Sequence, residues 1–102
     1  MLYEKITPAE AKERLQSGEN ILLLDVRMPD EYVRKHIPKS ISMPLNTLPK
    51  EVSSVIPHKD STIFVYCQSG ARSKNAAQIL LKLGYTDVYD IGGIANWPYE
   101  TE

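Results

Sequence analysis

The stretch that decides the fold is "TIFVYCQSGARSKNAAQILLKLG", residues 62–84. It opens with an apolar run, Thr62–Tyr66, whose β-branched and aromatic residues predict a buried strand. From Ser73 to Leu83 apolar side chains recur at helical spacing, and Gly84 tolerates the left-handed conformation of a helix end. The stretch therefore predicts a strand, a loop of small and polar residues, and a helix.

The same alternation continues on both sides of this unit. Thr7, Pro8 and Glu10 form a capping-box pattern that predicts a helix start, and Gly18 is expected near its end. Further strands are predicted at residues 21–26, 40–44 and 87–91, the last followed by a Gly-Gly turn, and further helices at residues 29–35 and within 45–56. Strands that alternate with helices predict an α/β layer fold, with helices on both faces of a mostly parallel sheet.

Composition and charge describe one ordinary globular domain over residues 1–102. The chain is 42% hydrophobic and 25% charged, and its net charge of −1 gives no case for nucleic acid or an anionic membrane as partner. No stretch approaches the roughly 20 apolar residues of a membrane span, and the start lacks a secretory pattern. We therefore expect a cytoplasmic location. The basic run "RKHIPK", residues 34–39, is either a solvated loop or a docking rim for an anionic substrate or partner.

The single cysteine, Cys67, is the candidate for chemistry. One cysteine forms no internal disulfide, and with two histidines it is a poor ligand set for zinc, so we expect no metal and no cofactor. A free cysteine after an apolar strand is often a small buried hydrophobe. Here, however, Gly70 can turn successive N–H groups inward, and both Arg72 and the following helix N-terminus favour a thiolate. These neighbours favour a nucleophile over a packed side chain.

Three segments of the chain resemble the single-domain rhodaneses, a family of sulfurtransferases. They are "LLDVRMPDEYVRKHIPKSISMP" at residues 23–44, "YCQSGARS" at residues 66–73 and "IGGIANW" at residues 91–97. Their order and spacing match the amino-terminal signature, active-site loop and carboxyl-terminal signature of that family. The resemblance implies a compact α/β domain with a central sheet of about five parallel strands.

The resemblance also implies a reaction and a site. Cys67 attacks the outer sulfur of a donor such as thiosulfate, releases sulfite, and holds the sulfur as a persulfide until a thiol, cyanide or a protein acceptor removes it. Asp25 is expected to brace the active loop, His36 to make structural hydrogen bonds, and Trp97 to pack. The residues expected to bind the substrate are Gln68, Ser69, Gly70, Ala71, Arg72 and Ser73 of the loop, with Arg27 as a second anion contact.

Two other functions remain open at this point. One is a persulfide relay or binding module that docks on a partner protein. The other is a small cysteine phosphatase or arsenate reductase, which the six-residue span from Cys67 to Arg72 disfavours because related phosphatase loops are one residue longer.

The chain also departs from the family pattern in three places. Lys35 and Lys39 stand where the signature usually has glycine, in a loop that the resemblance places near the active-site face, and a strained or differently shaped turn is expected there. Gln68 is uncharged, whereas thiosulfate-using members carry a basic residue in the loop. Attraction of an anion is then left to the remaining cations of the site, Arg72, Lys74 and Arg27.

Overall fold

Five parallel strands form one sheet in the computed structural model, which describes residues 2–102. The sheet order is β1-β5-β4-β2-β3, and every pairing is parallel. β4 therefore lies at the centre, which agrees with its continuous apolar sequence. This confirms the predicted parallel α/β sheet. The bounds are Glu4–Lys5 for β1, Ile21–Asp25 for β2, Ile41–Ser42 for β3, Thr62–Cys67 for β4 and Asp87–Gly93 for β5.

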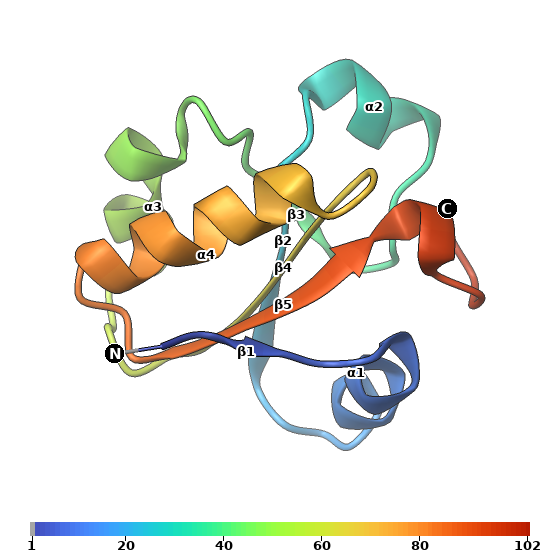
Figure 1. Cartoon of the computed structure of the whole chain (residues 1–102), viewed down its shortest axis with the longest axis horizontal. Helices are drawn as coiled ribbons and strands as arrows, with labels where there is room; N and C mark the ends of the chain where they lie inside the picture. The colour runs from blue at the N-terminus through green and yellow to red at the C-terminus, as the bar shows by residue number, and fades with distance from the viewer. Residues whose placement is uncertain (1) are drawn as a thin grey trace.

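Helices cover both faces of the sheet (Figure 1). Side chains of α3 and α4, including Val52 and Leu80, pack with Val65 of β4 in one core cluster. Ala11 of α1 packs with Phe64 of β4 in a second cluster on the opposite face. No helix within residues 2–102 is both long and apolar enough to span a bilayer. The bounds are Pro8–Leu15 for α1, Pro29–Arg34 for α2, Leu48–Val55 for α3, Ala71–Lys82 for α4 and Ile94–Asn96 for the 3-10 helix η1.

The structure confirms most of the predicted elements, corrects the start of α4 and the end of β5, and adds one strand that was not predicted. The capping box at Thr7 is present. α4 begins at Ala71, two residues before the predicted start, because Gly70 takes the N-cap position with φ +110°. The Gly-Gly pair is not a turn after the last strand but the end of β5, where the pairing with β4 shifts register. β1 was not predicted, because two exposed residues carry no apolar pattern.

The two lysines at family glycine positions differ in backbone conformation. Lys39 has φ +68°, the only non-glycine residue among residues 2–102 in the left-handed region. Lys35 has φ −169°, which is extended backbone open to any residue. Of the strained or differently shaped turn expected here, the strain therefore lies at Lys39, whereas Lys35 keeps an ordinary extended backbone.

This difference predicts opposite effects of glycine at the two positions. Lys39→Gly should raise the free energy of unfolding by about 0.5–1 kcal/mol, because relief of left-handed strain exceeds the entropy that glycine adds to the unfolded chain. Lys35→Gly should lower it by about 0.5 kcal/mol, because only the entropy term remains. Urea denaturation of both variants measures the two effects. Equal changes in both would contradict a strained backbone at Lys39.

Candidate active site

Cys67 ends the central strand and is held at the N-terminus of α4. Its side chain is only 1% exposed. The Gly70 N–H donates to Sγ at 3.0 Å, and the Ser73 hydroxyl oxygen lies 3.6 Å from Sγ. The Ser73 hydroxyl also lies 3.0 Å from the Gly70 carbonyl, to which it donates. The sulfur therefore sits in a cradle of backbone and hydroxyl groups at the carboxyl end of the sheet, where α/β folds bind ligands.

The loop after Cys67 is short and rests on β5. Only Gln68, Ser69 and Gly70 separate β4 from α4. A Cβ atom on Gly93 would lie 2.3 Å from the Gln68 carbonyl oxygen and 2.7 Å from the Ser69 Cα, so the loop backbone occupies the space of the missing side chain. The Ala95 N–H donates to the same Gln68 carbonyl at 3.2 Å. The carboxyl-terminal signature therefore contributes the platform for the active loop.

Arg72 is paired with a carboxylate that the sequence analysis did not identify. Its Nη1 and Nη2 donate to the two Glu31 carboxylate oxygens at 2.7 and 3.0 Å. This bond lowers the pKa of Glu31 to about 2, against the opposing effect of partial burial. Two residues 41 positions apart thereby join α2 to the first turn of α4, and α2 lies beside the active loop in Figure 1. Arg72 thus has a positioning contact in addition to the anion-binding role expected of it.

The ion pair predicts a stability change that depends on pH. Glu31→Gln should lower the free energy of unfolding by about 1 kcal/mol at pH 7, a value reduced for the partial exposure of both side chains. The pKa of Glu31 is depressed in the folded chain, from 4.5 to about 2, so its contribution is present above pH 4.5 and lost as pH falls toward 2. The difference in free energy of unfolding between the variant and the unaltered chain, measured by urea denaturation, should shrink as pH falls from 4.5 toward 2.

Glu51→Gln is the matched control for this prediction. Glu51 also lies in the first turn of a helix, α3, but it has no salt bridge within residues 2–102. Glu51→Gln should lower the free energy of unfolding by about 0.5 kcal/mol or less, because only the interaction of a first-turn carboxylate with the helix dipole is lost. Equal losses in both variants would mean that the Glu31–Arg72 pair adds nothing.

Arg27 is held rigidly by Asp25, and both side chains are buried. Asp25 Oδ1 accepts from the Arg27 backbone N–H and from its Nε, both at 3.0 Å, while Oδ2 accepts from Nη2 at 2.6 Å. Nη2 also donates to the Lys35 carbonyl at 2.6 Å. Asp25 therefore braces Arg27 and not the Cys67 loop, which corrects the role expected from the sequence. Within residues 2–102, Nη1 of Arg27 makes no hydrogen bond.

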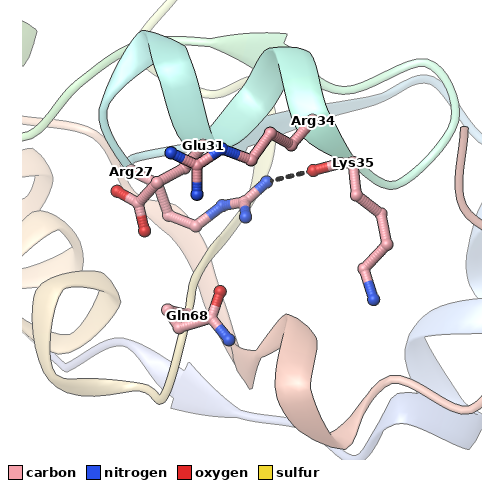
Figure 2. A pocket seen from close by; sticks show the side chains of 5 residues that line it. All are labelled: Arg27, Glu31, Arg34, Lys35 and Gln68. Carbon is pink, nitrogen blue, oxygen red and sulfur yellow. Dashed lines mark hydrogen bonds between the residues drawn. The ribbon is translucent and has the colours of Figure 1, made fainter.

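A cavity of about 380 Å³ opens beside the loop (Figure 2). Figure 2 shows the Arg27 guanidinium between α2 and Gln68, with its bond to the Lys35 carbonyl drawn as a dashed line. Lys35 therefore lies at the site, as the resemblance implied. Lys39 instead lines two other hollows beside α1, so its expected place near this face was wrong. The lining residues are Arg27, Glu31, Arg34, Lys35 and Gln68.

His36 and Trp97 make structural contacts. The His36 ring stacks on Tyr32 with centroids 3.9 Å apart, and its Nδ1 lies 2.9 Å from the Tyr32 carbonyl oxygen. Trp97 packs against the core cluster on the α1 face, and its indole N–H donates to the Glu100 carbonyl at 3.2 Å. These contacts agree with the hydrogen-bonding and packing roles expected from the sequence.

Comparison with known proteins finds one family over most of the chain. The model of the Rhodanese-like domain matches residues 7–99. The thiosulfate sulfurtransferase PspE of Escherichia coli is 37% identical, over 72% of this chain and 70% of its own. A sulfurtransferase of Allochromatium vinosum is 34% identical, over 94% of this chain and 89% of its own. The crystal structure of a rhodanese-related protein from Thermoplasma volcanium is similar at a TM-score of 0.82 and 31% identity, covering 98% of both chains.

Proposed function

Because the chain belongs to the rhodanese-like domain family, we propose that it transfers a sulfane sulfur from thiosulfate to a thiol through a persulfide on Cys67. The observation that carries the proposal is the environment of the Cys67 sulfur. It ends the central strand and receives the Gly70 N–H at 3.0 Å, and the next residue, Gln68, lines a cavity together with three cations. A relative of this chain is named a thiosulfate sulfurtransferase, which supports thiosulfate as donor.

The first half-reaction loads the enzyme. The Cys67 thiolate attacks the outer sulfur of thiosulfate, a new S–S bond forms at Sγ, and the bond to the sulfonate sulfur breaks. Sulfite leaves with the electron pair of the broken bond, so no proton transfer is required. The Nη1 group of Arg27 makes no hydrogen bond within residues 2–102, and it attracts the sulfonate oxygens of the donor.

The loop stabilises the transferred sulfur in this proposal. The Gly70 N–H already donates to Sγ and is the group that stabilises negative charge there, whereas the Ser73 hydroxyl, 3.6 Å from Sγ, donates its proton to the Gly70 carbonyl. The neighbouring backbone of Gln68, Ser69 and Ala71 completes the cradle. Arg72 acts mainly by position, since its bond to Glu31 holds the first turn of α4 against α2.

Mass spectrometry tests the proposed loading directly. The protein is incubated with thiosulfate or, separately, with 3-mercaptopyruvate, and the intact and digested masses are measured. The expected result is a gain of one sulfur atom on the peptide that contains Cys67, from thiosulfate, and its removal by cyanide. Loading by 3-mercaptopyruvate alone would reassign the donor. An unmodified cysteine with both donors would reject sulfur transfer through Cys67.

A further inference from the structure

The cavity beside Gln68 is larger than a small sulfur anion needs. At about 380 Å³ it falls within the range of about 300–1,000 Å³ in which proteins bind organic ligands. One water molecule takes up about 30 Å³ of liquid, so the cavity has room for roughly a dozen. Thiosulfate is a single tetrahedron and would fill a small part of this space. The remaining volume is available to a larger sulfur compound.

The cations of the cavity fall into an inner and an outer group. Arg27 is the inner cation, fixed by Asp25 next to the loop. Arg34 and Lys35 are the outer cations, at the carboxyl end of α2, and both are exposed. The one acidic lining residue, Glu31, is neutralised by Arg72.

The outer cations are free to bind a ligand. Arg34 meets Asp30 at 3.4 Å with both side chains more than two-thirds exposed, a contact that contributes little. Lys35 has no salt bridge within residues 2–102. A ligand that reaches from the Cys67 loop to this end of α2 therefore meets Arg27 and also Arg34 and Lys35. Carboxylates are the groups that match such cations.

We propose that the sulfur acceptor is a small thiol that carries carboxylates, and that Arg34 and Lys35 bind those carboxylates. This inference rests on the proposed function, because it concerns the second half-reaction. The acceptor thiolate attacks the outer sulfur of the Cys67 persulfide and forms a new S–S bond. The bond from Sγ to the outer sulfur breaks, and its electron pair returns to Sγ as the thiolate. Loading leaves the Cys67 persulfide as an anion, so its outer sulfur leaves on the product, a small-molecule persulfide anion, and this step also needs no proton transfer.

The test compares two forms of one thiol on the loaded protein. Protein loaded with thiosulfate and freed of excess donor is mixed with glutathione, or with glutathione whose two carboxylates are esterified. At subsaturating concentration, glutathione should remove sulfur about tenfold faster than its diester, because binding of the carboxylates lowers the KM for glutathione. In the double variant Arg34→Gln/Lys35→Gln this preference should fall to about twofold or less. Comparing preferences between variants cancels the difference in intrinsic reactivity between the two thiols.

Lys39→Gln is the matched control, since it removes a lysine only four residues from Lys35 that lines different hollows. Its preference for glutathione should stay near tenfold. The inference is overturned if the unaltered chain reacts equally fast with glutathione and with its diester. It is also overturned if the double variant still reacts about tenfold faster with glutathione. If cyanide still clears the sulfur in those cases, the proposed function stands and only the carboxylate site is lost. Failure of thiosulfate to load Cys67 would remove both.

Discussion

Cys67→Ser is expected to abolish sulfur loading, with a loss of at least about 10³-fold in transfer to cyanide. Serine retains an atom that can accept the Gly70 N–H, but a hydroxyl is a much weaker nucleophile than a thiol at neutral pH and forms no persulfide. The measurement is steady-state transfer from thiosulfate to cyanide, together with the mass of the protein after incubation with donor. No added sulfur should be found.

The fold of the serine variant should be intact, which separates loss of chemistry from loss of structure. Cys67 is buried, but serine differs from it by one slightly smaller atom, and the surrounding core residues are unchanged. Melting followed by circular dichroism should show a transition close to that of the unaltered chain. Transfer at a rate near the original in a folded serine variant would remove Cys67 from the mechanism.

Gly93→Ala is expected to damage both stability and loading, although residue 93 lies 26 positions from the cysteine. The added methyl would lie 2.3 Å from the Gln68 carbonyl oxygen and 2.8 Å from its carbonyl carbon, so the loop backbone must move. Overpacking against backbone should lower the free energy of unfolding by about 3 kcal/mol. A loop displaced by about 1 Å should slow sulfur loading about 100-fold. Urea denaturation and the rate of thiosulfate loading measure the two effects.

Gly92→Ala is the control for the steric argument. Gly92 has φ +87°, but a Cβ there would meet no atom within 4 Å. Alanine at this position should cost about 1–2 kcal/mol from backbone strain alone, without pressing on the active loop. The larger loss of loading should therefore belong to the variant at residue 93. If the variant at residue 92 loads sulfur as slowly as its neighbour, the contact between Gly93 and Gln68 is not what shapes the site.

The position of the nucleophile follows from patterns that are local in the sequence. An apolar run ends at Cys67, small and polar residues follow, and a helical stripe begins within a few positions. Such a unit places its loop at the carboxyl edge of a parallel sheet in any α/β fold. The capping box at Thr7 was predictable for the same reason, because each of its contacts spans three residues. The three signature segments then identify the family, which the comparisons confirm.

Roles that depend on two distant segments were predicted less well. Glu31 was not recognised as the partner of Arg72, since nothing in the neighbourhood of either residue shows that α2 and the first turn of α4 touch. The nearest signal was the charge of Glu31 inside a signature segment. Asp25 was assigned to the wrong partner because Arg27, only two residues away, folds its guanidinium back over the carboxylate.

The sequence by itself determined the order of strands and helices from α1 to β5, the buried strand that leads into Cys67, and the family to which the chain belongs. These depend on periodicity, capping and short motifs, which act over a few residues. Only the tertiary structure decided which cations line the cavity beside the Cys67 loop. Lys35 and Lys39 are four residues apart and alike in sequence, yet one lines the cavity at the Cys67 loop and the other lies beside α1. The physical reason is the tight turn at residues 37–40, where the Ser40 N–H donates to the Ile37 carbonyl at 3.1 Å and Lys39 takes φ +68°. Lys35 precedes this turn and stays beside α2, whereas Lys39 lies within it, beside α1.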